Sequence, residues 1–193
     1  MKYDQKNSKY CYPGSNVLIN IPGLREQAQL EAYERLVTAD RLRILGLRPI
    51  KGNYDLKHLC AIHQFIFKEI YPFAGQLREE DISKGYFLFA PTRFLVPQIN
   101  QLFHDLKREG HLKGKSFDVF IDRLAYYMAE FNVLHPFREG NGRTQREFFR
   151  CLALESGYVI DWSKVDAATI LDAMIRSPYD TAALKEVLHV LIT

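Results

Sequence analysis

The sequence lacks the features of a secreted, disulfide-stabilised or membrane-spanning protein. Its three cysteines, Cys11, Cys60 and Cys151, are odd in number and far apart, with no Cys-x-x-Cys pair. That usage argues against a disulfide framework or a cysteine-based metal site and suits a reducing compartment. The first residues are polar and do not read as a signal peptide. No apolar run approaches the roughly 20 residues that span a bilayer. We therefore expect a cytoplasmic protein with no membrane partner.

The chain also lacks a strong charge imbalance. Its formal net charge is +3 over 193 residues, which is too small to argue by itself for nucleic acid as a partner. The basic residues form no continuous stripe interleaved with aromatic residues, as single-strand binding would need. A nucleic-acid-binding helical domain is therefore the weakest alternative, and we expect no direct nucleic-acid contact.

Helix-like spacing of apolar residues dominates what is present. An apolar content of 47% is ordinary for a globular chain, and 193 residues suffice for one core. We expect one all-α domain over residues 1–193, a bundle of about seven to eight helices around a central helix–loop–helix at 117–156. An irregular arm rich in proline and glycine precedes it at 1–22. The helices are expected at 24–45, 56–70, 97–110, 117–134, 143–156, 165–175 and 180–191.

The helical pattern is interrupted after residue 70. Pro72 and Gly75 break it, and residues 82–91 then place aromatic side chains around a Lys84-Gly85 turn. This pattern fits a short β-hairpin. It also fits a connector packed against the core, and the residues alone favour the connector.

The most informative stretch is His135-Pro-Phe-Arg-Glu-Gly-Asn-Gly-Arg-Thr-Gln-Arg146. A helix is expected to end at His135, because Pro136 cannot continue it. Gly140 and Gly142 flank Asn141 and permit backbone conformations with positive φ and a close approach to a ligand. Successive amides that lead into a helix N-terminus can bind an anion.

The charges of this stretch point to a phosphate ligand. Arg143, Arg146 and Arg150 share one side of a helix at its positive end, where cations are normally disfavoured unless an anion binds there. Glu139 beside a polyphosphate suggests a bridging Mg²⁺, which takes carboxylate and phosphate oxygens. His135 has the pKa range of a general base. Each feature alone has a simpler explanation as a turn, a helix end or a solvated face, but together they indicate a site.

The same string resembles the signature of the Fic family, His-x-Phe-x-Asp/Glu-Gly-Asn-Gly-Arg-x-x-Arg, at every specified position. The similarity extends to residues 71–78, 82–85 and 89–91 and is greatest to toxin-type bacterial members. The resemblance implies a protein adenylyltransferase, which transfers AMP from Mg-ATP to a Ser, Thr or Tyr hydroxyl of a target protein. ATP and Mg²⁺ are then the expected substrate and cofactor.

The resemblance also implies a role for each residue of the motif. His135 would be the general base, Glu139 the metal ligand and Phe137 a structural anchor in the core. The residues expected to bind the nucleotide are Arg138, Gly140, Asn141, Gly142, Arg143 and Arg146. In the family, segment 82–91 is the flap, which binds the target peptide by strand addition. Its expected contact residues are Ser83, Lys84, Gly85 and Tyr86.

Regulation and mechanism leave open questions. Many Fic proteins carry an inhibitory Ser/Thr-x-x-x-Glu-Gly/Asn motif, and this sequence has none: the only glutamates followed by Gly or Asn are Glu109 and Glu139, preceded four residues earlier by Asp105 and His135. We therefore expect a separate small antitoxin to supply an inhibitory helix. Two alternatives stay open, a Fic-type transferase with another nucleotide or phosphorylated donor, and a non-catalytic nucleotide-binding module.

Overall fold

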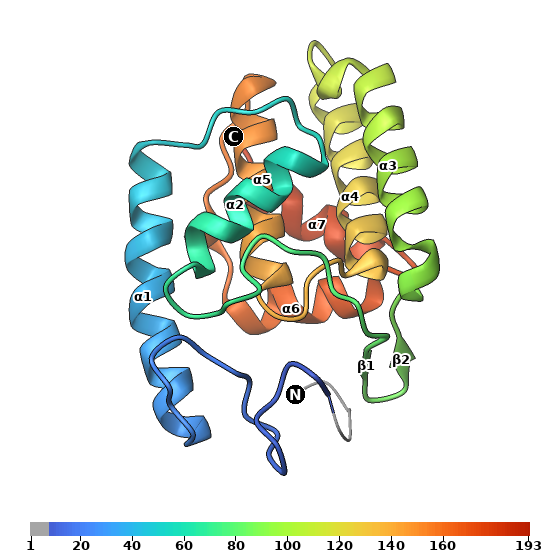
Figure 1. Ribbon diagram of the computed structural model, residues 1–193. Coiled ribbons are helices and arrows are strands. Elements are labelled where there is room, and N and C mark those ends of the chain that lie inside the picture. The colour runs from blue at the N-terminus through green and yellow to red at the C-terminus, as the bar shows by residue number, and fades with distance from the viewer. Residues whose placement is uncertain (1–7) are drawn as a thin grey trace.

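Seven α-helices, two short 3-10 helices and one hairpin make up the described part of the computed structural model, residues 8–193 (Figure 1). This confirms the prediction of an all-α fold with one small hairpin. Residues 1–7 of the expected arm lie outside the described range. No helix within residues 8–193 is both long and apolar enough to cross a membrane. The α-helices are α1 Gln27–Leu47, α2 Leu56–Phe67, α3 Thr92–Arg108, α4 Phe117–Leu134, α5 Asn141–Glu155, α6 Ala167–Arg176 and α7 Ala182–Leu191; the 3-10 helices are Gly110–Leu112 and Trp162–Lys164.

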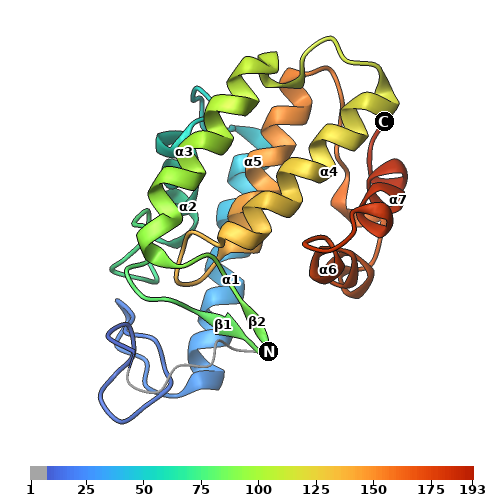
Figure 2. The same cartoon turned by 90° about the vertical axis from the view of Figure 1, so that its right-hand side faces the viewer.

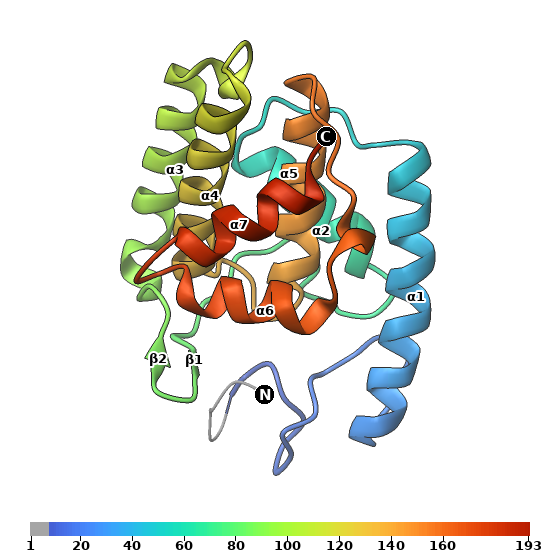
Figure 3. The ribbon, with the colours of Figure 1, turned by 180° about the vertical axis from the view of Figure 1, so that it is seen from behind.

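Helices α4 and α5 form the centre of the molecule. Helix α2 crosses α5 and is covered by α1, while α3 lies along α4 (Figure 2). On the opposite side, α7 packs on α4 and α6 packs on α7 (Figure 3). Aromatic side chains fill the contact between the central helices: Phe131 of α4 meets Phe149 of α5 edge to face at 5.5 Å between ring centroids. Burial of the broad apolar face of 117–134 therefore places this helix at the core.

Helix α3 and its neighbours differ from the predicted boundaries. Helix α3 begins at Thr92 and contains Pro97, whereas the sequence predicted a start near Pro97. The carboxylate of Asp81 accepts hydrogen bonds from the backbone N–H of Thr92 at 2.6 Å and from its hydroxyl at 2.9 Å, which stabilises the earlier start. Gly46 does not end the first helix, which continues to Leu47 and stops before Pro49. Helix α5 begins at Asn141, two residues before the predicted Arg143.

The hairpin joins the loops after α2 to the start of α3. Strand β1 (Ser83–Lys84) pairs antiparallel with β2 (Phe87–Leu88), and Gly85 takes a positive φ of 60° in the turn. The hairpin prediction is thus confirmed over the alternative of a simple connector. Tyr86 is fully exposed and Leu88 is 78% exposed, so the hairpin projects apolar surface from the body of the molecule.

Candidate active site

His135 lies where α4 ends, as the sequence predicted. It adopts a left-handed conformation with φ 45° and ψ 61°, immediately before Pro136. Its Nδ1 is 3.3 Å from the carbonyl oxygen of Asn132, and its ring stacks on that of Phe89 with 3.9 Å between centroids. Because a carbonyl only accepts hydrogen bonds, Nδ1 carries the proton and Nε2 is the basic nitrogen.

The surroundings of His135 keep its imidazole neutral. Burial, the main cause, lowers its pKa to about 3 together with the positive charges of Arg78 and Lys84, whereas the hydrogen bond to Asn132 acts in the opposite direction. The imidazole is therefore uncharged at neutral pH, and its Nε2 can accept a proton from an alcohol.

The loop that follows is held by its own side chains. The carboxamide of Asn141 accepts the N–H of Phe137 at 2.8 Å and donates to the carbonyl of the same residue at 2.7 Å. Phe137 is buried and stacks on His63 of α2 with 3.9 Å between ring centroids. Both ends of the Asn141 side chain are thus used to shape the loop, and the backbone of this residue begins α5.

His63 of α2 supports the loop through its imidazole. Its Nε2 is 3.0 Å from the carbonyl oxygen of Glu139, and its Nδ1 accepts the N–H of Gly75 at 2.7 Å. The imidazole is completely buried, and burial lowers its pKa to about 4. These two bonds show that His63 supports the loop.

The two glycines of the motif differ in conformation. Gly140 has a φ of 80°, and a Cβ placed there would lie 2.2 Å from the ring of Phe67. Gly142 lies within the first turn of α5 without a positive φ, and its nearest neighbour for a Cβ is the Arg146 guanidinium at 3.4 Å. The expected positive φ is therefore confirmed for Gly140 and is wrong for Gly142. Because Gly142 has no side chain, it leaves the N-terminus of α5 uncovered.

Arg143 is bonded to helix α1. Its guanidinium donates to Glu34 at 2.6 Å and to the hydroxyl of Thr38 at 3.3 Å, and it lies 3.6 Å from the carboxylate of Glu139. The hydroxyl of Tyr71 donates to the other oxygen of Glu34. Two carboxylates from distant parts of the sequence thus meet one arginine.

Arg146 and Arg150 have different surroundings. Within residues 8–193, Arg146 has no carboxylate within salt-bridge distance, and both burial and the neighbouring Arg143 lower its pKa. Arg150 instead pairs with Glu147 at 2.8 Å and donates to the carbonyl of Leu45 at 3.0 Å, which makes it a structural residue. A half-buried cation beside another cation favours an anion nearby. Arg138, also predicted to bind nucleotide, is 95% buried by the surrounding protein and only 5% exposed.

Glu139 is suited to a shared cation. Its side chain is 31% exposed, and burial and then Glu34 raise its pKa, while the N–H of Gly140 donates to it at 2.9 Å. The described residues contain no group of three His, Cys, Asp or Glu side chains that could hold a metal ion alone. An Mg²⁺ ion here would therefore take Glu139 together with phosphate oxygens, the coordination that this ion prefers.

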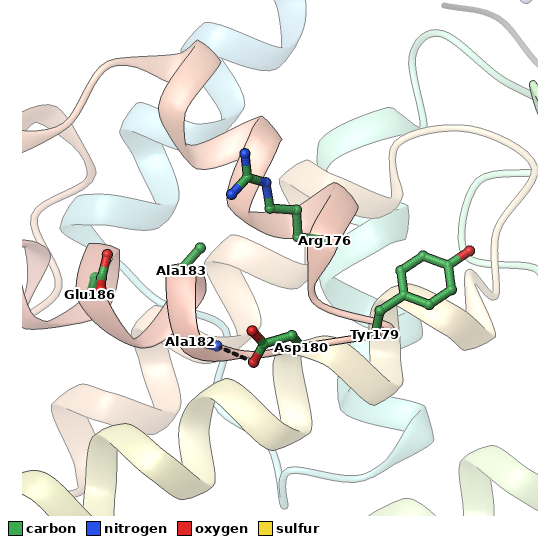
Figure 4. A pocket seen from close by; sticks show the side chains of 6 residues that line it. All are labelled: Arg176, Tyr179, Asp180, Ala182, Ala183 and Glu186. Atoms are coloured by element: carbon green, nitrogen blue, oxygen red, sulfur yellow. Dashed lines mark hydrogen bonds between the residues drawn. The ribbon is translucent and has the colours of Figure 1, made fainter.

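One cavity of the described residues lies away from the motif. It measures about 400 Å³ at the turn between α6 and α7 and is lined by Arg176, Tyr179, Asp180, Ala182, Ala183 and Glu186 (Figure 4). The ring of Tyr179 approaches that of Phe87 on the hairpin, with 6.2 Å between centroids. None of the lining residues belongs to the predicted site.

Residue-level reasoning missed several side chains that complete the site. Glu34 and Thr38 come from α1, Phe89 from the segment after the hairpin, and Tyr71 and Arg78 from the segment after α2. Tyr71 and Arg78 lie in a stretch that carries the family resemblance, which was the one available signal. Glu34 lies in an ordinary amphipathic helix, where nothing local marks it as a neighbour of the motif.

Fold and site together define a helical domain in which a neutral imidazole and a cationic helix N-terminus share one loop. Residues 53–153 match the model of the Fic/DOC family. The chain is 41% identical over 187 residues to the protein adenylyltransferase VbhT of Bartonella schoenbuchensis, covering 97% of this chain and 39% of VbhT. It is 40% identical to the "Probable protein adenylyltransferase Fic" of Salmonella typhimurium, over 87% of this chain and 83% of that protein.

A solved structure has the same architecture. The N-terminal Fic domain of a VirB-translocated Bep effector from Bartonella quintana, with bound ADP, superposes with a TM-score of 0.89 at 26% identity, over 95% of this chain and 94% of that one. The chain belongs to the Fic/DOC family. The predictions of the family, of its fold and of a nucleotidyltransferase are confirmed by these relatives.

Burial of neutral His63 makes a prediction for acid stability. A folded-state pKa of about 4, against about 6.5 in the unfolded chain, gives stability that is present above pH 6.5 and is lost as the pH falls toward 4. Between pH 6.5 and 5 this loss is about 2 kcal/mol for a fully buried histidine. We expect His63→Gln to weaken this pH dependence, measured by urea unfolding at both pH values. An equal dependence in wild type and variant would contradict the assignment.

The position of Glu34 makes a second prediction. The Glu34 carboxylate, only 16% exposed beside Arg143 and Glu139, repels a triphosphate bound at the same arginine. Glu34→Gln should keep an acceptor oxygen for Arg143, while its amide nitrogen donates to the Tyr71 hydroxyl. Mg-ATP binding should tighten by about three- to tenfold, or roughly 1 kcal/mol. Calorimetry with a non-hydrolysable ATP analogue measures this, with Glu69→Gln, whose carboxylate pairs with Arg41 of α1, as control. Weaker binding by Glu34→Gln would contradict the expected repulsion.

Proposed function

We propose that this chain transfers AMP from Mg-ATP to a Ser, Thr or Tyr hydroxyl of a target protein. The observation that carries the proposal is the shared corner between α4 and α5. There, the neutral imidazole of His135 precedes a loop whose other end is a helix N-terminus bearing Arg143 and Arg146. Such a corner can hold a phosphate chain and a base for the attacking alcohol at the same time.

The proposed reaction is a displacement at the α-phosphorus of ATP. The hydroxyl oxygen of the target forms a bond to this phosphorus, the bond to the bridging oxygen breaks, and pyrophosphate leaves. The hydroxyl proton passes to Nε2 of His135. Stabilisation of the developing charge comes from donors already in place, which is the main demand of this class of reaction.

Each motif residue has a proposed part in holding the nucleotide. The backbone amides at Asn141 and Gly142 bind phosphate oxygens, and Gly140 gives the turn the conformation that presents them. Arg143 binds the phosphate chain, and Arg146 binds the terminal phosphate. Glu139 would hold Mg²⁺, which supplies charge neutralisation of the phosphates when bound. Phe137 anchors the loop, and the buried Arg138 supports the nucleotide site.

The hairpin is proposed to bind the target. Its short strands leave backbone groups for strand addition by an extended peptide. Ser83, Lys84, Gly85 and the fully exposed Tyr86 would supply the contacts. The stacking of Phe89 on His135 supports this arrangement, because it joins the end of the hairpin segment to the proposed base.

Relatives support the choice of AMP. Two similar proteins are named adenylyltransferases, and a Fic domain with the same architecture carries bound ADP. ATP labelled at the α- or γ-phosphate tests the proposal with bacterial lysate proteins as acceptors. Label should be transferred from the α-position only, and mass spectrometry should find an added AMP. Transfer from the γ-position only would instead establish phosphoryl transfer.

A non-catalytic nucleotide-binding module is the second candidate, since the loop could bind nucleotide without a reaction. The neutral, base-competent His135 disfavours it. In a module of this kind, His135→Ala should leave the cellular phenotype unchanged. In an adenylyltransferase, the same substitution should change it.

A separate antitoxin is proposed as the regulator. The absence of the inhibitory motif from the sequence and the lack of a carboxylate beside Arg146 within residues 8–193 support it. A glutamate on the antitoxin helix would meet Arg146 and displace the terminal phosphate. Expression of the chain alone should slow bacterial growth, and His135→Ala should relieve the effect. Harmless expression of wild-type protein that still binds ATP would contradict this proposal.

A further inference from the structure

Arg78 is a fully buried cation between the hairpin and the end of α4. Its side chain has an exposed fraction of 0%. The guanidinium donates to the carbonyls of His135 at 2.9 Å, Leu134 at 3.2 Å and Glu80 at 2.8 Å, and also to that of Ala90. One side chain therefore joins the end of α4 to residues on either side of the hairpin.

These bonds complete the hydrogen bonding of the helix end. The last carbonyls of a helix have no partner within it and need donors from elsewhere. Here the Val133 carbonyl accepts the N–H of Ala90 at 3.0 Å, and Arg78 serves Leu134 and His135. The N–H of Arg78 itself donates to Pro136 at 2.9 Å. The end of α4 is thus capped by the residues that bracket the hairpin.

The capped residues include the proposed base. His135 takes a left-handed conformation, which costs on the order of 1–3 kcal/mol for a residue other than glycine unless its surroundings impose it. The bond from Arg78 to its carbonyl is one such restraint. The other bonds reach Glu80 and Ala90, on either side of the hairpin, and Phe89 stacks on the imidazole itself.

Fold stability alone does not readily explain why the charged guanidinium of Arg78 is buried here. Burying a guanidinium is costly unless its donors are all used. An acidic oxygen of Asp81 lies 3.9 Å away on a side chain that is 66% exposed, and the acceptors that join Arg78 to α4 and to the hairpin segment are backbone carbonyls. A fixed fork of donors matches several carbonyls in different directions, which a lysine ammonium does less well.

We propose that Arg78 is a positioning residue, which fixes the backbone turn that carries His135 and couples it to both ends of the target-binding hairpin. The proposal rests on the proposed function for its kinetic consequences. Arg78 contacts neither the nucleotide-binding arginines nor the first turn of α5 through any of the bonds described. Its loss should therefore affect the reaction more than ATP binding.

Arg78 also has an electrostatic effect on the base. Its positive charge, with that of Lys84 on the hairpin, disfavours protonation of His135. Removal of the Arg78 charge should therefore raise the pKa of the imidazole, and the acid limb of the rate profile should move to higher pH. A residue that only stabilised the fold would leave both quantities unchanged in the folded fraction.

Arg78→Gln and Arg78→Lys test the proposal. Arg123→Lys is the control. Arg123 is a half-buried arginine of α4, the helix that ends at His135, and it pairs with Glu109. It lies about three helical turns before His135. We expect the rate of AMP transfer at saturating ATP to fall about 100-fold in Arg78→Gln, while the KM for ATP changes less than about twofold. The lysine variant should recover part of the rate and the original pH profile.

A histidine-resolved NMR titration gives a readout that does not depend on activity. The imidazole of His135, assigned by comparison with His135→Ala, should titrate at higher pH in Arg78→Gln than in wild type. If wild-type protein transfers no AMP, the proposed function fails, while the titration still tests Arg78. Folded Arg78→Gln with wild-type turnover and an unshifted imidazole would overturn the inference, as would equal losses of turnover in Arg78→Gln and Arg123→Lys.

Discussion

Replacement of His135 by alanine is expected to lower the rate of AMP transfer by about 100- to 10,000-fold, the usual contribution of a general base. The reason lies in the state of the ring: Nδ1 is oriented by Asn132 and the imidazole is neutral, so Nε2 can take the hydroxyl proton. The backbone of the loop is held by the hydrogen bonds between Phe137 and Asn141. Mg-ATP affinity should therefore stay within about twofold.

Initial rates of label transfer from α-labelled ATP measure the first effect, and calorimetry with a non-hydrolysable analogue measures the second. His104→Ala provides the matched control, because His104 is a largely exposed histidine of α3 that lies 3.8 Å from the carboxylate of Asp105 on the same helix. A wild-type rate in His135→Ala would show that another group accepts the proton. Loss of ATP binding in the same variant would show that the imidazole holds the nucleotide instead.

Gly140→Ala is expected to destabilise the protein by about 3 kcal/mol or more. The left-handed backbone and the collision with a packed ring each cost on the order of 1–3 kcal/mol. The collision is with Phe67, a fully buried residue of α2 that cannot move aside into solvent. The phosphate-binding turn should be displaced with it, so ATP affinity should fall even in the folded fraction.

Gly142→Ala is the matched control for this prediction. Gly142 has a helical conformation and room for a methyl group, so its replacement should be neutral or stabilising by up to about 1 kcal/mol. Urea unfolding of the two variants beside wild type measures the difference. Equal stability of Gly140→Ala and Gly142→Ala would mean that α2 and the loop are less tightly packed than the structure shows.

Much of the fold could be predicted because it depends on local patterns. The apolar face of 117–134 predicted the bounds of α4. The predicted start of α2 at residue 56 is stabilised locally by Asp55, which accepts the N–H of His58 at 2.8 Å. The start of α3 could not be predicted, because its cap comes from Asp81 across the hairpin. Such a bond exists only after the chain has folded.

The candidate site divides in the same way. Its motif residues are contiguous, so the motif identifies them together without any knowledge of their geometry. Their partners come from elsewhere: Glu34 reaches Arg143 from α1, His63 supports the loop from α2, and Arg78 caps the helix of the base. Spacing along the chain carries no information about these contacts. Only the packing of α1 and α2 against α5 reveals them.

The contact between Glu34 and Arg143 has a consequence for how such a domain can change over time. The segment that matches the family model begins at residue 53, whereas α1 ends at Leu47. Substitutions in this first helix can therefore change the charge around Arg143, which is proposed to bind the nucleotide, while every residue of the shared segment stays the same. Two proteins with identical motifs could in this way differ in how strongly they hold ATP.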